Sequence, residues 1–490
     1  MHRSHVDGVP VHRCAEDGEL RATLHFGAGV RDETYRTRGV GALVAALAVR
    51  ETRRRTSETA RSVGVSTGTG ETAFSVSGRP EDVVEQLAAL CVALGELPVD
   101  GVADLVGAWE GAVSCLAGPA AAALNARYGA QASGLDGQER TCPWPPTAEM
   151  VSAHAATWFT QANAVLTLTG PEPVGLRLPL PEGDRPHRSA PRARYPRASW
   201  THRSIDGVAV SVEAPADSAA SDVAHRVFHD RVNAALAERP APVGPVETAV
   251  VPHDSRTVVR LLFTPAPADA IEEVAATVWS HALRLARIAP EQTEVDRHRR
   301  DATPLLDIAA HAELFGTPGP DEDGRQRALD AVTPDDVRDA WRQAMNQAQL
   351  VVPEGLLLDL AGPDGRRLWC TSCWTWDELP PWGEKFHEPL PRRAFRRSQE
   401  RHSTILTRDS VVSCTLGPFH TLRFDDVIAV ERHGSERVLI GRCGCDIGID
   451  PAWYRGGRRL IRALDEAIPA ELAYDCDEER GSHVQPPSRA

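Results

Sequence analysis

The chain has 490 residues, of which 42% are hydrophobic and 25% charged. This composition is typical of a folded globular protein with about three domains. The formal charge of −14 disfavours broad attraction to nucleic acid or to an anionic membrane. Lys385 is the only lysine, so lysine Schiff-base chemistry and the P-loop lysine are all but excluded.

The distribution of apolar residues predicts neither a membrane-spanning helix nor a secretory signal. No stretch approaches the roughly 18 apolar residues that indicate a membrane-spanning helix, and the segment from Met1 to Leu20 is charged throughout. A secretory signal would need an apolar core there. The ten cysteines are scattered along the chain, which favours a reducing compartment over a disulfide scaffold. We therefore expect a cytoplasmic protein without membrane insertion and without a nucleic-acid partner.

The first 170 residues alternate between strand and helix patterns. Period-two alternation predicts strands, and apolar residues at helical spacing, with Asp and Glu in the first turn, predict helices. The expected strands are residues 8–13, 20–26, 72–77 and 163–168, and the expected helices are residues 39–53, 79–95, 100–117 and 147–161.

A proline-rich segment at 171–200 interrupts this pattern, and the same order of elements then recurs up to residue 355. Two units of the same order indicate an internal duplication, although their sequences are not closely identical. After a second linker the pattern changes to short, closely spaced strands and one helix at 451–467, which fits a small β-barrel or sandwich. The expected boundaries are lobe 1 at 8–175, a linker at 176–200, lobe 2 at 201–355, a linker at 356–402, a small domain at 403–470 and a disordered tail at 471–490.

The expected fold class is therefore α+β. Each of two homologous lobes has helices packed on a mostly antiparallel sheet, and a C-terminal helix caps the small β-barrel.

Residues 27–33 (GAGVRDE) and 39–47 (GVGALVAAL) resemble a motif of the insulinase/pitrilysin family of zinc metallopeptidases. That family has a G-S-R-D-E turn followed by a helix reading G-x-A-H-x-x-E-H, in which two His bind zinc and Glu is the general base. Residues 158–170 (WFTQANAVLTLTG) resemble the end of a lobe in the family, and residues 282–303 resemble a helix pair of its second lobe. The resemblance covers about residues 10–355.

In this register, Ala42, Ala45 and Ala46 occupy the positions of the family's His, Glu and His. A methyl group can neither bind a metal nor transfer a proton. Residues 34–50 contain no His or acid, so a shifted register cannot restore the motif. The resemblance further implies a third-ligand remnant at Glu110 and a substrate-clamp remnant at Arg239. The tyrosine that accompanies this arginine in the family has no counterpart, because no tyrosine lies between Tyr195 and Tyr454.

The last domain resembles bacterial pleckstrin-homology-like domains, which usually act in protein interaction or assembly. The matching segments are residues 406–410, 422–430 (LRFDDVIAV) and 450–454 (DPAWY).

Cys370-x-x-Cys373 and Cys443-x-Cys445 supply four thiols that could hold a structural zinc between the second linker and the small domain. The alternative is that these are ordinary thiols in a packed linker, and this reading is favoured. No other cofactor is expected.

His225 and His229 are four residues apart on an expected helix, a spacing that can bind metal. No general-base Glu lies between them, so solvated or capped histidines on a helix face are the favoured interpretation.

The sequence thus leads to one main functional hypothesis and two alternatives. The main one is a noncatalytic peptidase-like subunit that binds peptide, pairs with an active zinc metallopeptidase of the same family, or does both. The first alternative is a standalone protein-interaction or assembly module. The second is an active metallopeptidase with a rebuilt metal site, for example at His225 and His229.

Overall fold

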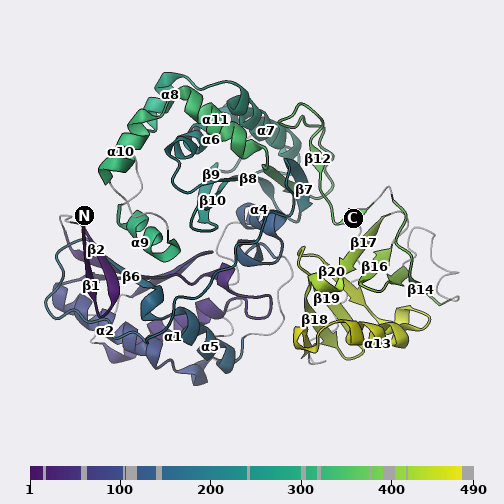
Figure 1. The fold of residues 1–490 in the computed structure, drawn as a ribbon, viewed down its shortest axis with the longest axis horizontal. Helices are drawn as coiled ribbons and strands as arrows, with labels where there is room; N and C mark the ends of the chain where they lie inside the picture. Colours follow the sequence, from purple (N-terminus) through teal and green to yellow (C-terminus); the bar gives the residue numbers. More distant parts are fainter. Residues whose placement is uncertain are drawn as a thin grey trace. The chain divides into compact units, whose positions relative to one another are not determined.

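The computed structural model divides into two compact units (Figure 1). The first comprises Met1–Gly137 and Pro145–Trp369, and the second comprises Gln138–Trp144 and Cys370–Ala490. The residues that the structure describes are 1–14, 18–56, 63–102, 105, 118–138, 146–239, 243–299, 305–316, 322–375, 378–389, 403–414 and 418–476.

The first lobe is a six-stranded sheet in the order β1-β2-β6-β3-β5-β4, with β2 and β6 parallel and the other pairs antiparallel. Apolar faces of α1, α2 and α5 form its core with one face of the sheet. The elements are β1 (His2–Val6), β2 (Val9–Arg13), β3 (Leu20–Phe26), α1 (Val40–Arg55), β4 (Gly64–Thr67), β5 (Thr72–Gly78), α2 (Pro80–Gly95), α5 (Ala148–Trp158) and β6 (Ala164–Leu168).

The second lobe has the strand order β12-β7-β11-β8-β10-β9, in which the strands from β7 to β9 repeat the order of the strands from β2 to β4, with the parallel pair, β7 with β11, at the equivalent place. This equivalence confirms the duplication of element order. The terminal strand β12 follows β11 in the chain, whereas β1 precedes β2. The strands are β7 (Ser199–Arg203), β8 (Gly207–Pro215), β9 (Glu247–Pro252), β10 (Thr257–Pro265), β11 (Gln349–Pro353) and β12 (Trp369–Cys370). The helices are α6 (Ala219–Ala237), α7 (Ile271–Arg287), α8 (Gln292–Arg297), α10 (Glu322–Ala331) and α11 (Pro334–Met345).

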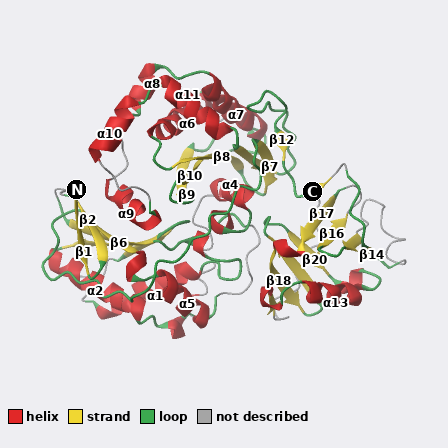
Figure 2. Ribbon diagram, in the orientation of Figure 1, coloured by secondary structure: helices red, strands yellow, loops and turns green. Residues whose placement is uncertain are grey.

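The two lobes exchange one helix each. The first lobe's α4 (Gly118–Tyr128) packs against β8, β10 and β11 of the second sheet. The second lobe's α9 (Leu305–Phe315) packs against β2 and β6 of the first sheet (Figure 2). Each sheet is thus covered on its second face by a helix from the other lobe. Through this exchange the two lobes form one compact unit.

The C-terminal unit contains two sheets, in the orders β13-β17-β16-β15-β14 and β20-β19-β18-β21. Its core joins both sheets to helix α13 (Gly457–Ala467). The strands are β13 (Trp374–Thr375), β14 (Glu384–His387), β15 (Ser403–Leu406), β16 (Ser410–Cys414), β17 (Phe419–Arg423), β18 (Val427–His433), β19 (Glu436–Gly441), β20 (Asp446–Ile449) and β21 (Ala473–Cys476).

The capping helix agrees with the expectation, but the described strands do not close into a barrel. A 3-10 turn at Phe424–Asp426 separates β17 from β18, and β18 instead pairs with β19 and β21. Three strands, β12, β13 and β14, lie in the segment expected to be a linker, and β21 lies in the expected tail.

The α+β class is thus confirmed. The expected helix at 100–117 falls almost wholly outside the described residues. Among the helices that are described, none is both long and apolar enough to cross a membrane.

Candidate functional site

The turn before α1 holds the start of this helix through the buried carboxyl group of Glu33. Gly39 has φ of 84°, a left-handed conformation that glycine adopts without strain. Both oxygens of Glu33 accept backbone N–H bonds, at 2.7 Å from Gly39 and 2.9 Å from Gly41. Burial raises the pKa of Glu33 to about 8, and the two N–H bonds oppose that rise. Glu33 therefore satisfies amides at the helix start that have no partner within the helix.

The three alanines that the resemblance aligns with the family motif lie in the first two turns of α1. Ala42 and Ala46 are partly exposed, whereas Ala45 is only 2% exposed and belongs to the core of the first lobe. The neighbouring His154 of α5 is close to the helix start, since a Cβ on Gly41 would lie 3.5 Å from its Nε2. Burial lowers the pKa of His154 to about 4, so it is neutral at neutral pH.

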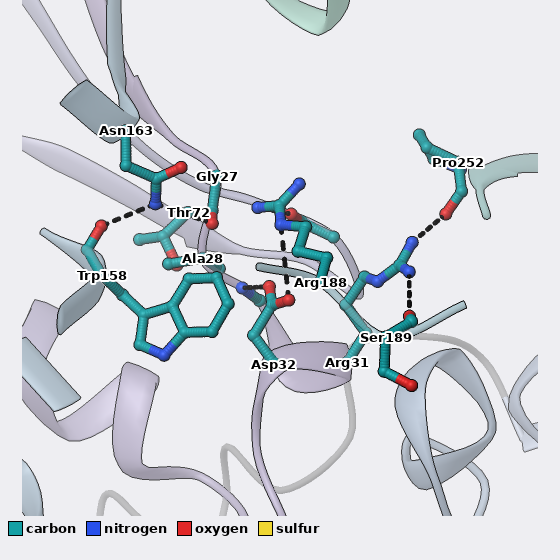
Figure 3. A network of polar contacts seen from close by, with 12 residues as sticks. Gly27, Ala28, Arg31, Asp32, Thr72, Trp158, Asn163, Arg188, Ser189 and Pro252 are labelled. Atoms are coloured by element: carbon teal, nitrogen blue, oxygen red, sulfur yellow. Dashed lines mark hydrogen bonds and ion pairs between the residues drawn. The ribbon is translucent and has the colours of Figure 1, made fainter. Parts of the chain in front are cut away.

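The acidic residue of the turn, Asp32, forms a buried ion pair with an arginine of the proline-rich segment (Figure 3). The Nε of Arg188 lies 3.4 Å from Oδ1 of Asp32, and the backbone N–H of Gly29 donates to Oδ2 at 3.0 Å. Burial raises the pKa of Asp32 to about 6, while Arg188 and Arg31 act against this rise. The guanidinium of Arg188 also lies 4.7 Å from the ring centre of Phe315 in α9.

Arg31 connects the same turn to the second lobe. Its guanidinium donates to the carbonyl oxygens of Pro252, Ser189 and His253, as Figure 3 shows for the first two. Burial lowers the pKa of Arg31, and the nearby negative charge of Asp32 opposes that shift. The arginine and the aspartate of the turn thus bind structural partners in the proline-rich segment and the second lobe.

The exchanged helix α4 is fixed to the second sheet by a fully buried arginine. Arg127 donates to the carbonyl oxygens of Ser211 at 2.6 Å and Gln347 at 3.0 Å. The hydroxyl of Tyr128 donates to Glu213 at 2.8 Å, and its ring stacks on His253 with centroids 4.5 Å apart. These contacts join the lobes through both polar and stacking interactions.

The family resemblance implied two further site residues, Glu110 and Arg239, and the structure describes only the second. Glu110 lies outside the described residues. Arg239 lies just after α6, and its guanidinium pairs with Glu273 of α7 at 2.6 Å. In this structure Arg239 therefore joins two helices of its own lobe.

His225 and His229 face different backbone carbonyls. The Nε2 of His225 lies 3.2 Å from the oxygen of Leu261, and that of His229 lies 3.2 Å from the oxygen of Val246. Burial lowers the pKa of His225 to about 3. Each ring nitrogen that contacts a carbonyl as a donor is unable to bind a metal at the same time.

Three of the four predicted zinc cysteines come together, with a histidine as the fourth member. The sulfurs of Cys373, Cys443 and Cys445 and a ring nitrogen of His420 all lie within 4.8 Å of one another. We call these four residues the cysteine–histidine cluster. The thiols of Cys373 and Cys443, together with burial, raise the pKa of the Cys445 thiol. Cys370 is exposed and is not a member of the cluster.

Sequence reasoning missed His420 because no short spacing connects it to the cysteines. The connection is a cross-strand pair, in which Trp374 of β13 lies opposite His420 of β17. Only the register of these two strands shows that Trp374, which directly follows Cys373, pairs with His420.

Comparison with known proteins gives matches by structure alone. No family profile matches the sequence, and no curated protein matches it. A peptidase M16 inactive domain from Pseudomonas fluorescens is similar with a TM-score of 0.55 at 15% identity, covering 71% of this chain and 97% of that chain. A chain of complex III2 from Candida albicans has a TM-score of 0.56 at 14% identity, covering 73% and 97%.

A protease from Helicobacter pylori is also similar, with a TM-score of 0.53 at 12% identity, covering 71% of this chain and 98% of that one. At such low identity, the likeness shows the fold alone. These neighbours show that the two-lobed part of the chain has the fold of an M16 peptidase domain.

Proposed function

We propose that this protein is a noncatalytic peptidase-like subunit that acts by binding peptide and a partner chain. The proposal is supported by the sequence of α1, where the resemblance aligns Ala42, Ala45 and Ala46 with the family's two ligand positions and its general-base position. Zinc hydrolysis needs a bound metal and a group that accepts a proton from the attacking water. These three side chains supply neither function.

The surroundings of α1 support the same conclusion. The charged residues of the neighbouring turn are occupied in structural contacts: Glu33 with the helix start, Asp32 with Arg188, and Arg31 with carbonyls of the second lobe. These three side chains hold the helix start and the contacts between the lobes. We therefore do not propose them as catalytic residues in place of the missing His, Glu and His. The protein thus keeps the scaffold of the site without its chemistry.

An edge strand offers a surface for peptide. The strand β4 is terminal in the first sheet, and three of its four residues are exposed, including Val65 at 43%. A terminal strand can hydrogen-bond to an extended peptide, which then lengthens the sheet. We propose that peptide binds in this way.

The pairing with another chain rests on the fold and its neighbours. A chain of similar fold is found in complex III2 of Candida albicans, a multisubunit assembly. By analogy, we propose an active metallopeptidase chain with an intact His-x-x-Glu-His motif as the partner, in the cytoplasm. The C-terminal unit, proposed to be pleckstrin-homology-like, supplies a further interaction module.

Affinity capture of the full chain from its own cells, with identification of the captured chains, tests the pairing. The proposal expects a stoichiometric M16-type chain with the intact motif, and a complex that cleaves peptides when the isolated chain does not. A chain that remains monomeric and captures no such partner contradicts the pairing. Stoichiometric partners that are not peptidases would instead favour the alternative of a standalone assembly module.

A further inference from the structure

The cysteine–histidine cluster lies wholly within the C-terminal unit and is assembled from three separate segments. Cys373 immediately precedes β13, His420 lies in β17, and Cys443 and Cys445 lie in the loop that joins β19 to β20. The strands β13 and β17 belong to the five-stranded sheet, whereas β19 and β20 belong to the four-stranded sheet. The cluster therefore connects the beginning of this unit to both of its sheets.

The distances within the cluster suit a small tetrahedral metal ion. The four ligand atoms lie within 4.8 Å of one another, and the Sγ of Cys443 is 4.0 Å from the Nε2 of His420. Around a tetrahedral zinc with Zn–S bonds of about 2.3 Å, neighbouring sulfurs are separated by about 3.7 Å. Only movements of an ångström or less are needed, and side-chain rotations can supply them.

The loop that carries two of the cysteines has a folded backbone that directs both sulfurs to one side. The N–H of Gly441 donates to the carbonyl of Cys445 at 2.8 Å, and the N–H of Gly444 donates to the carbonyl of Gly441 at 2.9 Å. Gly444 has φ of 87°, which favours glycine. A Cβ on Gly441 would lie 3.1 Å from the Sγ of Cys443, so the close turn favours glycine there as well.

A backbone donor also points at one of the sulfurs. The N–H of Cys445 donates to the Sγ of Cys443 at 3.4 Å. Such a bond stabilises negative charge on sulfur, and a cysteine binds metal as the thiolate. Burial adds to the case, because His420 is only 2% exposed and its ring is packed 5.7 Å from the ring of Trp374.

We propose that Cys373, His420, Cys443 and Cys445 bind one structural zinc ion in the C-terminal unit. Three thiolates and one imidazole are a common ligand set for structural zinc. Four protein ligands leave no open position for water or substrate, so the ion stabilises the fold and performs no hydrolysis. This proposal is independent of the noncatalytic function, because the α1 face lies in the other unit.

The test measures zinc in the full-length protein, purified without chelator or a metal-affinity step. We expect about one zinc per chain in the wild type, and a loss of at least fivefold in Cys443→Ser and in His420→Ala. Cys370→Ser is the matched control, since it removes a nearby thiol that is outside the cluster, and it should keep the zinc. If Cys370→Ser loses the metal while His420→Ala retains it, the ligand set is wrong.

A second measurement, on the wild-type protein, tests the proposal even if the variants fail to fold. Replacement of zinc by Co²⁺ should give the intense sulfur-to-cobalt absorption and the visible bands of a tetrahedral site, and a mercurial that blocks thiols should release the metal. Substoichiometric zinc with no cobalt spectrum, a disulfide within the cluster, or iron in place of zinc would each overturn the proposal.

Discussion

The α1 region of the first lobe and the cysteine–histidine cluster of the C-terminal unit relate sequence to metal chemistry in opposite ways. At α1, the local sequence resembles a metal-binding motif, but the residues that the resemblance aligns with the ligands are alanines. In the cluster, ligands separated by up to 72 positions in the chain come together, and only the three cysteines among them belong to short sequence motifs. A motif therefore shows where a site can lie, whereas the side chains decide whether it can function.

A zinc-binding cluster outside the peptidase-like lobes also affects the interpretation of a measured zinc content. Zinc in the purified protein would ordinarily suggest a peptidase, given this fold. Because the four-ligand cluster is expected to hold zinc, total zinc content cannot distinguish an active enzyme from an inactive one. Activity has to be measured together with variants that remove the cluster's ligands.

The largest effect is expected from removing the metal of the C-terminal unit. Structural zinc contributes about 10–16 kcal/mol in isolated zinc-finger peptides. With a hydrophobic core already present, we expect Cys443→Ser to destabilise this unit by about 5 kcal/mol. Urea unfolding, followed separately for the two units by hydrogen exchange, would measure this loss. An equal loss in the two-lobed unit would contradict a local role.

Placing the family's general base back into α1 should have the next largest effect. Ala45→Glu puts a carboxylate into the core of the first lobe and should destabilise it by about 4 kcal/mol. Ala42→Glu is the matched control, because Ala42 is partly exposed on the same helix, and it should cost less than about 1 kcal/mol. Thermal or urea unfolding compares the two variants, and equal costs would show that Ala45 is not in the core.

A smaller effect is expected in the pH dependence of stability. The pKa of Glu33 is raised to about 8, so the folded state holds this proton while the unfolded state releases it near pH 4.5. Folding stability from this group is therefore greatest below pH 4.5 and falls as the pH rises towards 8. Between pH 5 and pH 7 we expect a loss of about 2 kcal/mol.

Glu33→Gln should abolish that loss, whereas Glu81→Gln, which alters an exposed acid of α2, should leave it intact. Urea unfolding at several pH values measures the difference. An unchanged slope in Glu33→Gln would mean that the carboxyl of Glu33 remains ionised throughout this range.

Much of the fold follows from local sequence patterns. The alternation from Leu20 to Phe26 predicts β3 with its observed bounds, and the Pro80-Glu81-Asp82 start predicts α2. The recurrence of element order predicts the duplicated sheets. Such elements bury one face within their own lobe, so their periodicity is visible in the sequence.

The elements that sequence patterns missed depend on contacts from elsewhere in the chain. In α4, every residue from Pro119 to Tyr128 is buried, because a sheet of the other lobe covers it, so no amphipathic pattern marks it. The open pair of C-terminal sheets depends on the turn at Phe424–Asp426. His420 becomes a candidate ligand only through its register with Trp374.

The central claim, that the M16-type lobes are noncatalytic, is tested most directly by incubating the zinc-loaded full-length chain with a peptide library. Mass spectrometry of the products, in parallel for the wild type and for Cys443→Ser, measures cleavage. The account predicts no cleavage above the buffer control for either protein, because Ala42, Ala45 and Ala46 provide no ligand and no base. Chelator-sensitive cleavage that persists in Cys443→Ser would contradict it.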